Sequence, residues 1–217
     1  MTEEVEILLT QLKSDDSNIK QNVLEKIGKI NPEGALEIIL PFLKDQDADV
    51  RCMAAFSLGD IQNTGAIPHL LKFLEQEQDK ELRDCGFSAL EDYQDLTVLQ
   101  YLLDELEKPK SSRHPRQDVA RQLRKFDTDA SVAALIKLLQ EDDDWVVQDY
   151  SADGLLILNR VSLRPIWETA LEHSNNYVQE TAKKAIVQIK HRTSRKKRQP
   201  RLKMRMTRKA KHKCRNH

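Results

Sequence analysis

Residues that could do acid–base, nucleophilic or metal chemistry are scattered along this chain. No two histidines lie four residues apart on one predicted helix face, the spacing that lets a helix offer both to one metal ion; they are His69, His114, His173, His191, His212 and His217. Neither a Gly-rich phosphate loop nor a Gly-x-Ser-x-Gly turn occurs. We therefore predict no catalytic residue, no metal site and no cofactor.

The cysteines and tryptophans are weak candidates for chemistry. Cys52, Cys85 and Cys214 are an odd number without paired metal-ligand spacing, so a disulfide framework is not expected. Cys52 and Cys85 could be nucleophiles, but we favour partly buried structural cysteines. Trp145 and Trp167 could stack on a base, yet single aromatic residues at helix starts more often pack against the protein.

Charge is divided sharply between two parts of the chain. Residues 191–217 hold 13 Lys and Arg and no Asp or Glu, so the first 190 residues hold 22 basic side chains against 35 acidic ones, a net charge of −13. The carboxylates of the run 141–144 lack the spacing of a calcium loop and are expected to form a capped turn. The basic segment has few apolar residues, which predicts a disordered arm. This arm could bind a polyanion, or it could fold back on the acidic body of its own chain.

A repeat of 31 to 33 residues organises the elements that would position these side chains. It is anchored at Ile19, Val50, Leu82, Pro115, Val147 and Val178. The positions 8 and 11 residues after each anchor are large and apolar or aromatic, and the position 5 after it breaks this pattern only at Lys183. Such offsets place side chains on one helical stripe, and a period of this length is typical of a solenoid.

The stretch 49–61 followed by Gly65-Ala-Ile-Pro-His-Leu-Leu-Lys-Phe-Leu74 resembles the HEAT-like repeats of the phycobilisome lyase type. The resemblance covers about residues 1–190 and implies an all-α, right-handed α-solenoid of the HEAT/armadillo-like class, with about six helix pairs. It also implies, as one alternative, a phycobilin lyase subunit or a chaperone-like relative acting on phycobiliproteins, with Cys52 or Cys85 as a possible bilin acceptor. No bilin-site residue can be matched, and no His-Glu pair resembles those of the deoxyhypusine hydroxylases.

The predicted organisation is a repeat domain over 1–190 and a disordered basic tail over 191–217. The expected repeats cover about 1–30, 31–62, 63–94, 95–127, 128–159 and 160–190. Pro115 stands in an anchor position but fits the first turn of a helix. A long polar residue follows each anchor, and we expect the basic ones, such as Arg51 and Arg83, to bond a turn of their own or the next repeat.

Second helices usually line the concave face of a solenoid, where partners dock. Positions about 2, 6, 9 and 10 after each anchor should point outward there, which also includes Cys52 and Gly59. The residues that we expect to bind a protein partner on this face are Phe56, Asp84, Glu91, Asp92, Arg121, Arg124, Lys125, Asp149 and Asp153. The tail residues expected to bind a polyanion are Arg195, Lys196, Lys197, Arg198, Arg201, Lys203 and Arg205.

These observations favour a non-catalytic scaffold for a protein partner, acting as a monomer or within a hetero-complex. Nucleic-acid association through the tail is a further alternative, although the acidic body differs from the cationic surface of the HEAT-type DNA glycosylases. The acidic N-terminus does not resemble a secretory signal and no apolar run is long enough to span a membrane. We therefore expect a cytoplasmic protein.

Overall fold

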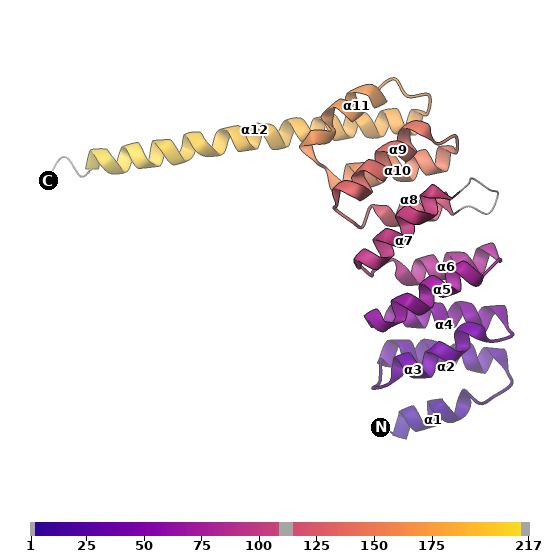
Figure 1. The fold of residues 1–217 in the computed structure, drawn as a ribbon. Helices are drawn as coiled ribbons and strands as arrows, with labels where there is room; N and C mark the ends of the chain where they lie inside the picture. Colours follow the sequence, from indigo (N-terminus) through magenta and orange to yellow (C-terminus); the bar gives the residue numbers. More distant parts are fainter. Residues whose placement is uncertain (1–2, 109–114, 214–217) are drawn as a thin grey trace. The chain divides into compact units, whose positions relative to one another are not determined.

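The computed structural model describes residues 3–108 and 115–213, with side chains described up to Ser194, and its regular elements there are all helices (Figure 1). They fall into six pairs. The first helices are α1 (Glu3–Gln11), α3 (Ala35–Ile39) with η1 (Leu40–Lys44), α5 (Ile67–Gln76) with η2 (Thr64–Ala66), α7 (Leu96–Glu107), α9 (Asp129–Glu141) and α11 (Arg164–Ala170) with η3 (Val161–Leu163). The second helices are α2 (Ser17–Ile30), α4 (Ala48–Asp60), α6 (Lys80–Leu90), α8 (Arg116–Leu123), α10 (Trp145–Leu158) and α12 (Asn176–Lys213).

Four of the second helices, α2, α4, α6 and α10, begin at aspartate caps, as the turn residues of the sequence predict, whereas α8 begins after Pro115 without a side-chain cap. Asp16, Asp47, Asp79 and Asp144 each accept a hydrogen bond from a backbone N–H of the helix that follows. A side-chain oxygen at this position satisfies a donor that has no partner inside the helix. Helices α2 and α10 end at asparagines in the left-handed conformation, Asn31 and Asn159, a conformation that asparagine tolerates better than most residues.

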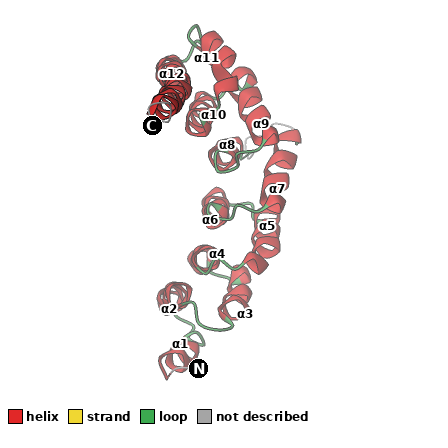
Figure 2. Ribbon diagram, turned by 90° about the vertical axis from the view of Figure 1, so that its left-hand side faces the viewer, coloured by secondary structure: helices red, strands yellow, loops and turns green. Residues whose placement is uncertain are grey.

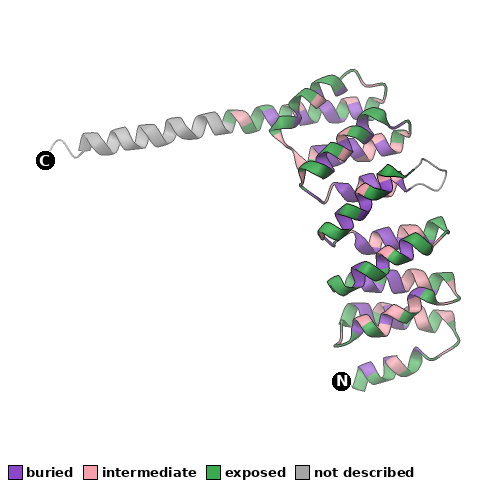
Figure 3. Ribbon diagram, in the orientation of Figure 1, coloured by how far each residue is buried: buried purple, intermediate pink, exposed green. Residues whose placement is uncertain are grey.

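The chain divides into two compact units, residues 1–131 and 132–217, where the repeat pattern predicts one domain over 1–190. In unit 1, Figure 2 shows α2, α4, α6 and α8 end-on in one layer, with α3, α5 and α7 in the other. Figure 3 shows buried and exposed positions alternating along these helices, as expected for two layers that share a thin core.

Burial confirms the predicted apolar stripe at most of its positions. Of the anchors, Val50, Val147 and Val178 are fully buried, and the positions eight residues further are equally inaccessible at Ile27, Leu58, Leu123 and Leu155. The first repeat departs from the pattern, since Ile19 and Ile30 are 39% and 43% exposed. At the eleventh position, Tyr93 donates a hydrogen bond to the carbonyl of Leu58 at 2.7 Å, and burial raises the pKa of this phenol to about 12.

Glycine sets the spacing of the second helices in unit 1. A Cβ built on Gly59 would lie 2.9 Å from the carbonyl oxygen of Ala89 in α6, and one on Gly28 would lie 3.0 Å from the Cα of Ser57 in α4. Both glycines follow their anchors by nine residues. The prediction that Gly59 points outward is therefore wrong: it is buried because the neighbouring second helix passes directly over it.

The polar residue after the anchor bonds a turn of its own or the next repeat at Lys20, Arg51 and Gln148, as predicted for the basic ones, whereas Arg83 donates to the carbonyl of Leu74 near the end of α5. Lys20 forms an ion pair with Asp45 of the next repeat at 2.9 Å, and Arg51 forms one with Glu77 of the next repeat at 3.2 Å. Arg51 also donates to the carbonyl of Asp45 in its own turn at 2.9 Å. In unit 2, Gln148 donates to the carbonyl of Asp142 in the same way at 2.7 Å. A polar side chain directly after the anchor therefore stabilises a turn at Lys20, Arg51 and Gln148.

In unit 2, α10 and α12 run side by side in the same direction. Asn175, just before α12, donates to Asp149 of α10 at 2.8 Å, and Arg192 donates to the carbonyl of Asn159 at the end of α10 at 2.7 Å. The backbone then continues as helix to Lys213. The sequence instead predicts a disordered arm that begins at residue 191. Its Lys, Arg, Gln, Leu, Met and Ala residues have high helix propensity and favour this helix, whereas Pro200 lies inside it and opposes it.

Candidate protein-binding face

The predicted binding residues of unit 1 lie on α4, α6 and α8 or directly after them, in one layer of helices. Phe56 lies six residues after Val50 in α4 and is 40% exposed, in contrast to the buried Ala54, Ala55 and Leu58 around it. The aromatic ring therefore presents apolar area to solvent from a rigid helix. We call the positions Phe56, Asp84, Glu91, Asp92, Arg121, Arg124 and Lys125 the second-helix face of unit 1.

Five of these predicted residues contact one another instead of remaining separate acidic and basic patches. The Glu91 carboxylate lies 3.3 Å from the Lys125 amine, 3.6 Å from the Arg124 guanidinium and 3.9 Å from that of Arg121. Asp92 adds a contact of 3.8 Å to Lys125. Glu91 and Asp92 directly follow α6, and the three cations lie at the end of α8 or directly after it. This network therefore joins the C-terminal ends of α6 and α8.

Two carboxyl groups, Asp84 of α6 and Asp118 of α8, lie beside this network, nearer the start of their helices. Burial raises the pKa of Asp118, and the nearby charge of Asp84 and a hydrogen bond with it raise this pKa further. Arg121 opposes the shift, since its guanidinium donates to Asp118 at 3.1 Å. Asp84 of α6 therefore lies beside Asp118 of α8, which extends the contact between these two helices.

The predicted residues of unit 2 have neutral partners. Asp149 accepts a hydrogen bond from the Asn175 amide, while Asp153 accepts from the Tyr177 hydroxyl at 2.9 Å. The pKa of Asp149 is raised, first by burial and then by the charge of Asp153, and the bond from Asn175 works in the opposite direction. The Asp153 carboxylate likewise raises the pKa of the Tyr177 hydroxyl that it accepts from.

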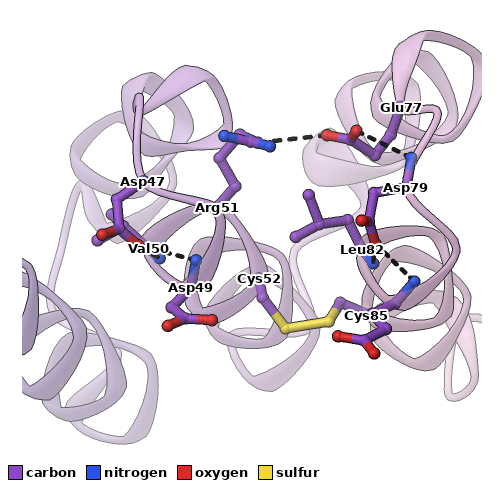
Figure 4. The surroundings of a disulfide bond; sticks show 10 residues. Asp47, Asp49, Val50, Arg51, Cys52, Glu77, Asp79, Leu82 and Cys85 are labelled. Carbon is purple, nitrogen blue, oxygen red and sulfur yellow. Dashed lines mark hydrogen bonds and ion pairs between the residues drawn. A yellow bond between two sulfur atoms is a disulfide. The ribbon is translucent and has the colours of Figure 1, made fainter.

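A disulfide joins Cys52 of α4 to Cys85 of α6, with their Cα atoms 5.5 Å apart (Figure 4). The expectation of two unpaired structural cysteines is therefore wrong. The bond lies one helical turn before Phe56 and beside the Arg51–Glu77 ion pair. It links two consecutive repeats covalently within the second-helix layer.

The signal for this disulfide was present in the repeat itself. Cys52 and Cys85 are 33 residues apart, about one period, and follow their anchors by two and three residues. Equivalent positions in successive repeats point in similar directions, so contacts between adjacent second helices join positions with different offsets, as between Cys52 and Cys85. The odd number of cysteines concealed this signal, because the third one, Cys214, lies in the basic segment and not in a repeat.

The predicted tail residues Arg195, Lys196, Lys197, Arg198, Arg201, Lys203 and Arg205 have side chains outside the described part of the chain. Within the side chains that are described, no group of three or more His, Cys, Asp or Glu residues could hold a metal ion. None of the described helices is long and apolar enough to cross a membrane.

Residues 5–91 match the family of HEAT repeats, so the N-terminal part of the chain contains repeats of this type. The chain matches no curated protein sequence. Its fold is similar to that of an engineered protein at 21% identity and a TM-score of 0.56, with 88% of this chain and 98% of that one covered. A second engineered protein is similar at 23% identity and a TM-score of 0.52, with 88% and 100% covered.

The chain also overlaps with the complex of CpcE and CpcF of phycocyanin lyase from Nostoc, at 20% identity and a TM-score of 0.45, with 85% of this chain and 64% of that chain covered. An overlap of this quality carries no argument about activity. The helix pairs, the family match and the two engineered proteins together define an all-α repeat fold of the HEAT type.

Proposed function

We propose that the chain is a non-catalytic HEAT-repeat scaffold that binds a protein partner through the second-helix face of unit 1. The observation that carries this proposal is the exposure of Phe56, a large aromatic side chain on a helix held to its neighbours by a disulfide, ion pairs and close glycine contacts. Rigid aromatic anchors supply most of the binding energy at many protein interfaces, because little entropy is lost when they are buried.

The charges around Phe56 define what kind of partner fits. Glu91 and Asp92 are matched by Arg121, Arg124 and Lys125, so this network as a whole attracts neither a strongly acidic nor a strongly basic surface. We expect the partner to place an apolar pocket over Phe56 and polar groups over the network. Rim charges of this kind contribute more to specificity than to affinity.

The test is capture of proteins from an extract of the native host on wild-type chain and on the variants Phe56→Glu and Arg121→Glu. Proteins held by wild type should be retained about tenfold less by Phe56→Glu, as for loss of an interface anchor. Ile7→Glu is the matched control, since Ile7 is 54% exposed on α1 and outside the proposed face. Equal retention by all variants, each with an unchanged helical circular dichroism spectrum, would rule out this face.

The basic segment supports a second part of the proposal, that the tail binds an acidic partner. Its 13 cations within residues 191–217 would release counterions from a polyanion. Nucleic acid is one such partner. The binding of the tail to a mixed-sequence duplex should weaken steeply as the salt concentration is raised. Deletion of 191–217 should abolish that binding, whereas binding that survives the deletion would assign it to the repeats.

A further inference from the structure

An acidic stretch of the described chain surrounds α10. Between Leu138 and Asn159 there are six Asp and Glu residues and no Lys or Arg. Trp145, Asp149, Asp153 and Ile157 recur every four residues, so they form one row along this helix. The apolar members at its two ends, Trp145 and Ile157, are 67% and 60% exposed. We call this row the acidic α10 face.

The two carboxylates of this face differ from those of unit 1 in their partners. Among the described residues, Asp149 and Asp153 are bonded by the neutral groups of Asn175 and Tyr177, whereas Glu91 lies within ion-pair distance of three cations. Like charges four residues apart on a helix repel one another. A cation supplied from outside would therefore relieve this repulsion and gain a charge-assisted hydrogen bond.

The basic segment of the same chain cannot supply that cation while α12 stays helical. Tyr177, in the first turn of α12, contacts Asp153, and Arg192 already lies at the end of α10. Arg195 follows Tyr177 by 18 residues, about 27 Å along a helix. The cations thus lead away from Trp145 and Asp149 of their own chain, and the contact has to be made with another molecule.

We propose that the basic segment of one copy docks on the acidic α10 face of a second copy. The inference rests on the tail of the proposed function and identifies its acidic partner. Lys and Arg side chains would pair with Asp149 and Asp153, and one of them would stack on the exposed ring of Trp145. Leu202, Met204 and Met206 give the segment apolar side chains for Ile157. The −13 body and the +13 segment make the two surfaces complementary.

The experiment measures the mass of the full chain by light scattering as its concentration is raised, at about 0.05 M and about 0.5 M salt. We expect assemblies at low salt that return to single chains at high salt, with the association weakened about tenfold or more by this change. Asp149→Asn with Asp153→Asn should abolish association at low salt. Asparagine still accepts from Asn175 and Tyr177, so the fold is preserved.

The matched control is Glu3→Gln with Glu4→Gln, which removes two exposed carboxylates from α1 and should leave association unchanged. A second readout is the emission of Trp145, because Trp167 is only 1% exposed and serves as a buried reference. The emission of wild type should shift on association, and Trp145→Phe should remove that shift.

A chain that stays single at every concentration overturns the inference, as does association that both pairs of variants weaken equally. If a nucleic acid duplex binds the tail and the chain does not self-associate, the tail keeps its polyanion role and the second-copy docking fails. Partner capture through Phe56 would be unaffected, because it uses different residues of unit 1. The two proposals can therefore fail separately.

Discussion

At the scale of single residues, the molecule uses its charges mainly to hold repeats together. Lys20 reaches Asp45 and Arg51 reaches Glu77, in each case across one repeat boundary. These side chains are more than three-quarters covered, so their pairs are less screened by salt than surface pairs. Asp149 and Asp153 instead have the neutral partners Asn175 and Tyr177.

The Lys20–Asp45 pair gives the first two repeats an acid-sensitive contact. A hydrogen bond from Lys20 lowers the pKa of Asp45 below its usual value of about 4. Because the pKa is lower in the folded chain, the stabilisation is present above the unfolded value and is lost as the pH falls through the folded value. We predict that Asp45→Asn lowers the unfolding free energy at pH 7 and reduces its further loss on acidification to about pH 3.

Denaturant titrations at the two pH values measure this effect. Asp49→Asn is the control, since it removes one exposed carboxylate nearby, from the first turn of α4. An acid-induced loss as large in Asp45→Asn as in wild type would show that the pair does not contribute.

The sequence predicts the residues that face the core better than those that face a neighbour. Val50, Leu58 and Ile61 follow from helical period alone, because burial between the two layers repeats with each turn. Gly59 and the ion network of Glu91 depend on how closely two second helices approach, which one helix in isolation does not determine. The predicted face residues of unit 1 lie on the second helices or directly after them, while the sequence did not predict their ion pairs.

At the scale of elements, close contact between second helices fixes the repeat spacing. We predict that Gly59→Ala destabilises unit 1 by about 1–3 kcal/mol, because the new methyl meets the backbone of Ala89 at 2.9 Å and the two helices must separate. The gain in helix propensity, about 1 kcal/mol, opposes this loss only in part. Thermal denaturation followed by circular dichroism measures the change.

Gly86→Ala provides the comparison for that measurement. Its new methyl would meet side chains, Leu74 at 2.8 Å and Phe73 at 3.1 Å, which can rotate away. We expect a smaller loss than for Gly59→Ala. A Gly59→Ala chain as stable as wild type would mean that α4 and α6 are not in close contact at this point.

At the scale of the whole molecule, the Cys52–Cys85 disulfide ties the second repeat to the third. It closes a loop of 33 residues, and the chain-entropy model assigns such a link about 3–4 kcal/mol. We predict that a reductant lowers the melting temperature of wild type and leaves that of Cys52→Ala with Cys85→Ala unchanged. Alkylation of free thiols should modify only Cys214 before reduction.

Three reactive thiols in the untreated protein would contradict this prediction. Reduced cellular compartments disfavour such bonds, whereas oxidising ones preserve them. The oxidation state in the native host is thus the observation that relates this feature to a compartment.

The disulfide also changes how the chain responds to mechanical force. When a helical repeat array is stretched from its ends, repeats usually peel away one after another and each releases its full length of polypeptide. Here the sulfur link bypasses the chain from Cys52 to Cys85, a sequence separation of 33, so about 110 Å of extended chain stays locked until the bond is reduced. Under tension, the disulfide would bear the force in the middle of unit 1. The extension of the fully unfolded chain would increase by about 110 Å only after a reducing agent is added.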